Sequence, residues 1–354
     1  MLLNKDYHTD PRVWKELLSF SRKGDHETSV ISNRHKVNTK HKVRFILNLI
    51  SFYLYGLSVA RIRSRYWGID AIHAHDLDTL PLGILLARLH DLPLIYDAHE
   101  VYAYMIADDV SYGLRRFVYA VERRLTRRCD RVITVSRNVA FAVSEHPEDC
   151  VLVMNCPGDP PPIVLAPDKK GALWLGYFGA LEQGRFILEA MEAVEATPGW
   201  ELVIAGSGTL EDRIRAHSSA RVRFLGQLPH ESAIQQMGAC DLQLLMFDPR
   251  NANSIIGMPN RLFEAMSLKK PVVATYHTDS GSLVRDLDCG FECGYAVSAL
   301  SVLLTYLAKH PEELPWRGQK AYLAWGREYN WARQELKLFS MYHAIEEGIA
   351  YDRA

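Results

Sequence analysis

The sequence has almost no net charge. Its 354 residues include 41 Lys and Arg against 42 Asp and Glu, which gives a formal charge of −1. A protein whose main ligand is nucleic acid usually carries a basic excess, so this balance argues against a nucleic-acid partner. Hydrophobic residues make up 48% of the chain, and this share excludes general disorder. A chain of this length and composition is typical of about two globular domains.

Paired cysteines are missing too. Six cysteines are scattered along the chain without a CxxC pair: Cys129, Cys150, Cys156, Cys240, Cys289 and Cys293. The sequence therefore predicts neither a zinc ribbon nor a disulfide framework, and free thiols fit a reducing cytoplasm. The residues indicate no need for a metal or a cofactor.

No uncharged run reaches transmembrane length. The first residues, Met1 to Asn4, are followed at once by Lys5 and Asp6, so we expect no signal peptide and a cytoplasmic location. Two basic regions leave peripheral membrane attachment open. In residues 34–67 basic side chains flank the apolar run 45–57, and residues 115–128 hold six arginines. An anionic membrane surface on the inner face of the cell membrane suits this pattern, and so do ordinary helices with solvated basic faces.

The order of elements predicts an α/β protein with parallel sheets. Strand-like and helix-like patterns alternate through the chain, for example a helix that opens at Asp10-Pro11 and ends at Gly24, and a strand at residues 173–178. Residues 156–167 contain five prolines, which predict a linker between two domains.

Histidines and acids stand together where two predicted strands of the first half end. His75-Asp76 follows one strand, and His99-Glu100 follows the next one. Because ligands gather at the carboxyl ends of parallel strands, we expect these pairs to line one crevice, although satisfied polar loops would look the same. Asp97 and Glu100 are placed to orient the His99 ring or to raise its pKa.

The first predicted turn supplies two further candidates. Asp10 and Arg12 are candidates to contact a substrate, and Asp10 is equally placed to cap the helix that follows.

Residues 257–275 carry the clearest functional pattern. Gly257 and Pro259 open a predicted helix, with Pro259 at its first position, and a short buried strand follows at residues 272–275. The first N–H groups, of Asn260, Arg261 and Leu262, would favour a phosphate, and Arg261 adds a positive charge. Glu264, one turn further, could accept hydrogen bonds from the two hydroxyls of a ribose. The pattern thus indicates a nucleoside diphosphate site, although an ordinary αβ unit with an exposed Glu fits it as well.

The run Pro-Asn-Arg-Leu-Phe-Glu-Ala-Met at residues 259–266, followed by Lys-Pro-Val-Val-Ala at 270–274, resembles the donor helix of retaining family 4 glycosyltransferases. In a branch of that family the run reads Pro-Asn-Lys-Leu-Phe-Glu. The resemblance implies a GT-B fold, in which two Rossmann-like, doubly wound domains face a central cleft. It divides the chain into an acceptor-side domain at 1–160, a nucleotide-sugar domain at 161–325 and a final helix region at 326–354 that crosses back to the first domain.

The same resemblance assigns roles to individual residues. Glu264 matches the ribose-binding glutamate, Arg185 the basic residue against the donor diphosphate, and His99 the histidine beside the transferred sugar. Most members carry a second glutamate for the donor sugar, and Ile256 stands there instead. A second basic residue near Arg185 is also missing, and Arg261 is the candidate to substitute for it.

The function predicted from these features is the transfer of a sugar, with retained anomeric configuration, from a nucleoside diphosphate sugar to a hydroxyl of a saccharide or lipid-linked acceptor. Synthesis of a cell-surface polysaccharide or glycolipid is the setting it implies. His99 would be catalytic, and Asp10, Arg12, His75, Asp76 and Glu100 are candidates for the acceptor side. Two alternatives stay open: a sugar-nucleotide epimerase, and a catalytically silent partner that binds nucleotide sugar. The absence of the first motif glutamate at Ile256 favours the second alternative.

Overall fold

The protein divides into two compact units. The computed structural model describes residues 1–24, 27–32, 42–66, 68–107, 110–160, 171–217 and 219–348. One unit consists of Met1–Asn155 and Glu335–Ala354, and the other of Cys156–Gln334. The first part of the predicted basic region, residues 34–41, and residues 161–167 of the predicted proline linker lie outside the described part of the chain.

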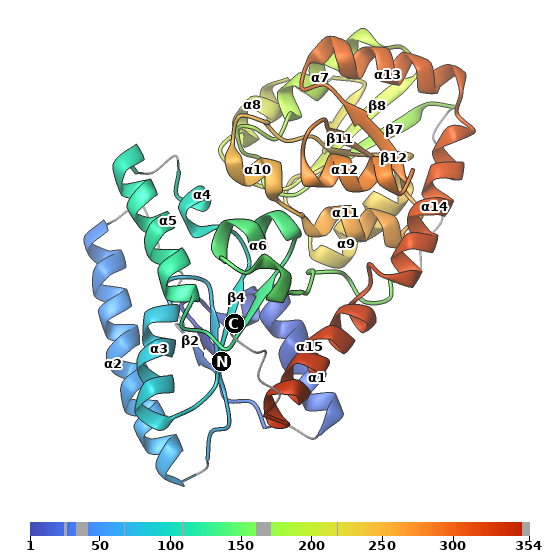
Figure 1. The fold of residues 1–354 in the computed structure, drawn as a ribbon. Coiled ribbons are helices and arrows are strands. Elements are labelled where there is room, and N and C mark those ends of the chain that lie inside the picture. Colours follow the sequence, from blue (N-terminus) through green and yellow to red (C-terminus); the bar gives the residue numbers. More distant parts are fainter. Residues whose placement is uncertain are drawn as a thin grey trace. The chain divides into compact units, whose positions relative to one another are not determined.

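The first unit is a parallel sheet flanked by helices (Figure 1). Its strands follow the order β2-β1-β3-β4-β5-β6, and all described pairs are parallel, with Ile72 beside Leu94 and Ile95 beside Arg131. The strands are β1 (Leu2–Leu3), β2 (Ile31–Ser32), β3 (Ile72–His75), β4 (Leu94–Ala98), β5 (Arg131–Thr134) and β6 (Val151–Leu152). The helices are α1 (Pro11–Lys23), α2 (Lys42–Tyr66), α3 (Leu80–His90), α4 (Tyr102–Met105), α5 (Tyr112–Thr126) and α6 (Arg137–Val143).

Local sequence explains where α1 begins and ends. The Asp10 carboxylate accepts hydrogen bonds from the N–H groups of Arg12 and Val13, and Pro11 occupies the first turn. Gly24 follows the last residue with φ of 71°, in the left-handed region that ends many helices. The predicted start and end of this helix are confirmed, and so is the capping role of Asp10.

The second unit repeats the architecture with strands in the order β12-β11-β10-β7-β8-β9, again parallel. They are β7 (Leu173–Phe178), β8 (Trp200–Ala205), β9 (Val222–Phe224), β10 (Leu242–Leu245), β11 (Val272–Thr275) and β12 (Gly290–Cys293). The helices are α7 (Ile187–Ala196), α8 (Glu211–Ala216), α9 (His230–Ala239), α10 (Ala252–Ile256), α11 (Asn260–Ser267), α12 (Asp279–Asp286), α13 (Val297–Lys309) and α14 (Glu313–Arg327).

Packing around Trp200 anchors the core of the second unit. This residue is fully buried in a cluster that includes Leu175 and Leu300, and its indole N–H donates to the carbonyl of Leu304, 2.8 Å away. The buried tryptophan thus satisfies its one polar group while joining β8 to α13.

Both sheets contain a point where the strand order reverses. In the first sheet β1 lies between β2 and β3, and in the second β7 lies between β10 and β8. Chains that leave such neighbouring strands turn to opposite faces of the sheet, which opens a crevice at the carboxyl ends where ligands bind. The residues after β1, β3, β7 and β10 are therefore the first candidates for a site.

The last helix, α15 (Trp331–Glu346), ends within the first unit. Its Phe339 and Tyr342 rings pack edge-on against Phe20 of α1, and the Tyr342 hydroxyl lies 2.7 Å from His73 Nδ1. Among the described residues, no helix combines the length and the apolar character that crossing a membrane requires.

Two predicted boundaries are wrong by a small but informative margin. Pro259 has extended ψ of 140° and precedes α11, so it is the cap residue and not the first helical residue. The strand before His99, which the sequence predicts at residues 92–96, is β4, and it extends to Ala98. Asp97 is consequently a buried strand residue, and not part of a loop.

Candidate functional site

Two guanidinium groups stack on one aromatic ring at the reversal point of the second sheet. Phe247 follows β10, and the Arg185 guanidinium lies 4.7 Å and the Arg261 guanidinium 5.9 Å from its ring centre. Arg261 also stacks on Tyr177 at 4.6 Å and donates from Nη1 to the carbonyl of Phe178, 2.9 Å away. Two predicted donor-binding arginines, far apart in sequence, therefore meet at the ends of β7 and β10.

Glycines bring the backbone turns of β7 and β8 into direct contact beside these arginines. Gly179 has φ of 148°, and a Cβ there would lie 3.1 Å from the Arg261 guanidinium. Gly206 also has φ of 148°, and a Cβ would lie 1.8 Å from the Gly179 carbonyl oxygen. Only glycine fits at Gly206, because any side chain would push the two turns apart.

The start of α11 is arranged differently from the prediction. No side chain caps it, and the N–H of Leu262 donates to the carbonyl of Pro259 at 3.0 Å. The donors that this helix start can offer a phosphate are therefore those of Asn260 and Arg261, and the N–H of Leu262 is already used.

Glu264 lies one turn inside α11, with 15% of its side chain exposed. Its Oε1 is 3.8 Å from Nε2 of His230, which begins α9 and is 78% exposed. His230 did not stand out in the sequence, because only the packing of α9 against α11 brings it to the carboxylate.

The reversal point of the first sheet carries a second cluster. Lys5, after β1, lies 2.8 Å from Asp10 and 3.6 Å from Asp76. His99 Nδ1 lies 4.0 Å from Asp10 and 3.9 Å from Asp76. Asp76 has φ of 63°, a conformation that costs an aspartate energy and that is often kept at functional sites. Asp76 and His99, which were expected to line one crevice, thus lie close together with Asp10 beside them, while Glu100 is exposed.

Behind this cluster lies a fully buried network. Arg12 is 1% exposed, and its guanidinium donates to Asp97 at 2.8 Å, to Glu16 at 3.2 Å and to the carbonyl of Val153 at 2.6 Å. His75 is 0% exposed, and its Nδ1 lies 3.1 Å from Nε2 of His99. Arg12 and His75 were candidates for direct contact with the acceptor. Because both side chains are buried, this role does not fit their positions in the structure.

Neighbouring charges and burial shift the pKa values of the side chains in this network in opposite directions. Burial alone would lower the pKa of His99, but the carboxylates of Asp76 and Asp97 raise it to about 9. Burial raises the pKa of Glu16 to about 8 against the opposing effect of Arg12. Burial would also raise the pKa of Asp97, yet Arg12 and His99 hold it well below its ordinary value. The surroundings therefore favour a protonated His99 and an ionised Asp97, and burial disfavours the charged form of Glu16.

Four members of this network could offer ligands to a metal ion. Glu16, His73, His75 and Asp97 each present an atom within 4.8 Å of the others, and imidazole with carboxylate suits a transition metal. The Arg12 guanidinium already pairs with both carboxylates, so a divalent cation would join a positive charge in the same buried space. The expectation that no metal is needed stays a prediction.

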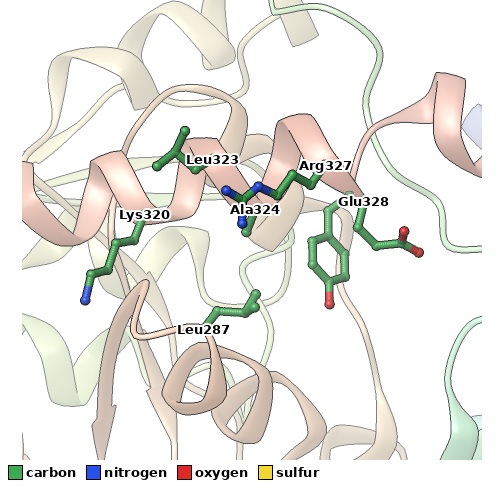
Figure 2. Close-up of a pocket in the computed structure, with 7 residues that line it drawn as sticks. Leu287, Lys320, Leu323, Ala324, Arg327 and Glu328 are labelled. Atoms are coloured by element: carbon green, nitrogen blue, oxygen red, sulfur yellow. The ribbon is translucent and has the colours of Figure 1, made fainter.

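A separate pocket of about 360 Å³ opens between the end of α12 and α14 (Figure 2). Leu287, Lys320, Leu323, Ala324, Arg327, Glu328 and Tyr329 line it. Neither the arginines at Phe247 nor Glu264 belong to its lining, so we keep it apart from the candidate donor site.

Comparisons with known proteins agree for both halves of the chain. Residues 12–156 match the family model described as "Glycosyltransferase Family 4", and residues 170–303 match the model "Glycosyl transferases group 1". A comparison with curated protein sequences finds no match.

Solved structures match over nearly the whole length. Sucrose-phosphate synthase from Thermosynechococcus elongatus aligns with a TM-score of 0.74 at 16% identity, covering 98% of this chain and 99% of the other. HepE of Anabaena, in complex with UDP and glucose, has a TM-score of 0.71 at 16% identity, with coverage of 97% and 99%. The lipopolysaccharide outer core galactosyltransferase WaaB, in its apo form, has a TM-score of 0.66 at 13% identity, with coverage of 97% and 98%. At such identities these likenesses show the fold, which is the predicted GT-B type with two Rossmann-like domains.

Proposed function

Because the chain belongs, through both of its halves, to the glycosyltransferases that these two models describe, we propose that it transfers a sugar with retained configuration from a nucleoside diphosphate sugar to an acceptor hydroxyl. The second unit would bind the donor, and the first would bind a saccharide or lipid-linked acceptor. Synthesis of a cell-surface polysaccharide or glycolipid is the setting we propose for it.

The observation that carries the proposal is the pair of arginines on Phe247 beside the open start of α11. A leaving diphosphate gathers negative charge as the sugar departs. Arg185, Arg261 and the N-terminus of α11 would stabilise that charge, which lowers the barrier to transfer. Arg261 supplies the second cation that the sequence lacks near Arg185, and the 16% identical HepE structure, which holds UDP and glucose, supports a ligand of this class.

Glu264 would hold the ribose of the donor. Its carboxylate is only 15% exposed, so hydrogen bonds to two hydroxyls would face little competition from water. On the first unit, Asp10 and Asp76 would accept hydrogen bonds from sugar hydroxyls, and His99 would contact the transferred sugar.

A screen of the purified protein against nucleoside diphosphate sugars tests the proposal. Binding to the folded state alone raises stability by about 2.7 kcal/mol when the ligand is at 100 times its Kd, so a true donor raises the melting temperature. Product analysis with that donor then distinguishes a transferase from an epimerase and from a catalytically silent binding partner. A new glycosidic bond supports transfer, whereas conversion of the sugar without an acceptor indicates an epimerase. Binding with neither transfer nor slow hydrolysis indicates the silent partner that Ile256 keeps open.

We also propose that the first unit attaches to an anionic membrane surface. Helix α2 exposes Leu47, Ile50 and Leu54, which lie about one helical turn apart, and Tyr55 next to Leu54, each more than half exposed. Helix α5 exposes Tyr112 and Phe117, both at 65%, and the guanidinium groups of Arg115 and Arg116 lie within 6 Å of the Tyr112 ring centre, at 5.2 and 5.9 Å. Exposed aromatic and apolar groups with arginines at their side favour the interface of an anionic bilayer.

A further inference from the structure

The ring of His99 has one nitrogen on each side of a boundary between buried and accessible groups. Its Nε2 faces inward, 3.1 Å from Nδ1 of His75 and 3.6 Å from Oδ2 of Asp97, both fully buried. Its Nδ1 faces Asp10, whose side chain is buried with 6% exposed, and Asp76, whose side chain is 24% exposed. Only the Nδ1 side is therefore open to a substrate.

Hydrogen-bond roles in the network follow from the contacts of His75. Where two imidazole nitrogens lie 3.1 Å apart, one must donate and the other must accept. Both nitrogens of the His99 ring face carboxylates: Nδ1 lies 4.0 Å from Asp10 and 3.9 Å from Asp76, and Nε2 lies 3.6 Å from Asp97. A proton on each nitrogen is therefore favoured, so Nε2–H donates to His75. His75 then accepts at Nδ1 and must carry its own proton on Nε2, which lies 3.8 Å from Oε2 of Glu16.

We propose that His75 is a positioning residue, which accepts the Nε2–H of His99 and thereby presents the Nδ1–H of His99 to the substrate between Asp10 and Asp76. This inference rests on the proposed transfer function. Asp97 is the buried anion beside the His75–His99 pair. Its Oδ2 lies 3.5 Å from His75 Nδ1 and 3.6 Å from His99 Nε2, and it accepts from the Arg12 guanidinium at 2.8 Å. An imidazole held in this way loses little freedom when the substrate arrives, so its hydrogen bond is available in the transition state.

His73 lies in the same buried cluster as His75 but has a different hydrogen-bond partner, so it provides a control for the role of His75. Its ring stacks on His75 with 4.2 Å between centres, but its Nδ1 pairs with the Tyr342 hydroxyl, and the described structure gives it no hydrogen bond to His99. A change at Tyr342 therefore disturbs the same buried cluster without removing the acceptor for His99.

The first test needs no activity. Spectra of ¹⁵N-labelled histidines in the intact protein report which ring nitrogens carry protons. We expect His75 to be a neutral Nε2–H tautomer at neutral pH and His99 to stay doubly protonated until the pH approaches about 9. A His75 protonated on Nδ1, or a His99 that titrates near 6.5, would overturn the proposal. So would one equivalent of a bound transition metal in the purified protein.

Variants test the consequence for turnover. His75→Asn places a side-chain oxygen near the position of Nδ1 and keeps an acceptor, whereas His75→Leu fills the space without one. We expect His75→Leu to lower kcat about 10- to 100-fold with little change in donor KM, and to lower the pH at which His99 titrates. His75→Asn should restore most of the turnover, and Tyr342→Phe should leave it within about twofold.

Equal losses in both His75 variants, with an unchanged His99 titration, would show a merely structural residue and overturn the inference. If His75→Leu does not fold, the His75 tautomer in the wild-type spectrum still decides. A wild-type protein that transfers no sugar to any acceptor would refute the proposed function, whereas the spectra test the His75–His99 hydrogen bond in either case.

Discussion

At the scale of single residues, Glu264 offers the simplest test of the donor site. We expect Glu264→Ala to weaken nucleoside diphosphate sugar binding about tenfold or more, because a hydrogen bond to a charged group contributes about 1.5–3 kcal/mol. Titration calorimetry measures this change. Glu231→Ala removes the same charge from an exposed position on α9 and should leave the affinity unchanged. Unaltered donor affinity in Glu264→Ala would remove the ribose role from this residue.

Arg185 should distinguish the diphosphate from the rest of the nucleotide. If its guanidinium contacts phosphate, Arg185→Ala lowers affinity for a nucleoside diphosphate by about tenfold or more and affinity for the nucleoside hardly at all. Competition binding with the two ligands gives both values. Arg213→Ala, an equal charge change on the exposed face of α8, is the matched control. Equal losses for both ligands would argue that Arg185 supports the fold instead.

At the scale of elements, the contact between the β7 and β8 turns predicts opposite outcomes for two glycines. Gly206→Ala should destabilise the second unit by about 1–3 kcal/mol or more, because its Cβ meets the Gly179 carbonyl and its φ disfavours alanine. Gly113, near the start of α5, has nothing within 4 Å of its Cβ, and Gly113→Ala should be neutral or stabilising by up to about 1 kcal/mol. Urea unfolding of both variants measures the difference, and a stable Gly206→Ala protein would contradict the close approach.

The elements also show what the sequence could predict. The strands at 173–178 and 272–275 and the limits of α1 are confirmed, because apolar runs and helix caps act over a few neighbouring residues. The burial of Arg12 was not predictable in this way, since it depends on Asp97 of a strand 85 residues away. Spacing did contain one signal that was missed: Arg12 and Glu16 stand four apart, on one helical face. Phe247 carried none, because its role comes only from the two arginines that fold onto it.

At the scale of the whole molecule, the buried network makes the first unit sensitive to alkaline pH. The pKa of His99 is raised above its unfolded value near 6.5 to about 9, and that of Glu16 is raised to about 8. The contribution of these two protonated groups to the free energy of unfolding is complete below their pKa values in the unfolded chain. It is lost as the pH rises through their pKa values in the folded protein. For His99 alone this loss is on the order of 3 kcal/mol.

Hydrogen exchange measured by mass spectrometry at pH 6.5 and 9, after correction for intrinsic rates, tests this expectation. Peptides from β3 and β4 should lose protection at pH 9, and peptides from β7 and β8 should not. Glu16→Gln removes one of the two titrations and should make the loss smaller. Equal protection of β3 and β4 at both pH values would refute the alkaline sensitivity.

Membrane attachment is likewise a property of the whole molecule. Vesicles with anionic lipids should sediment the protein at low salt and release it at high salt, because each basic residue near such a surface contributes about 1 kcal/mol. Replacing Ile50 and Leu54 of α2 by glutamine should weaken this attachment. The exposed Val302 of α13, changed to threonine, serves as the control in the other unit. No sedimentation at low salt would count decisively against the proposal.

The return of α15 to the first unit has a consequence for biosynthesis. Phe20 and His73 find their partners Phe339 and Tyr342 only when the last part of the chain has been made. About 180 residues of the second unit are translated in between, which takes about 10–35 s at usual elongation rates. During that interval the first unit exposes the surface that α15 later covers. On the ribosome, the half of the protein that is made first is therefore completed last.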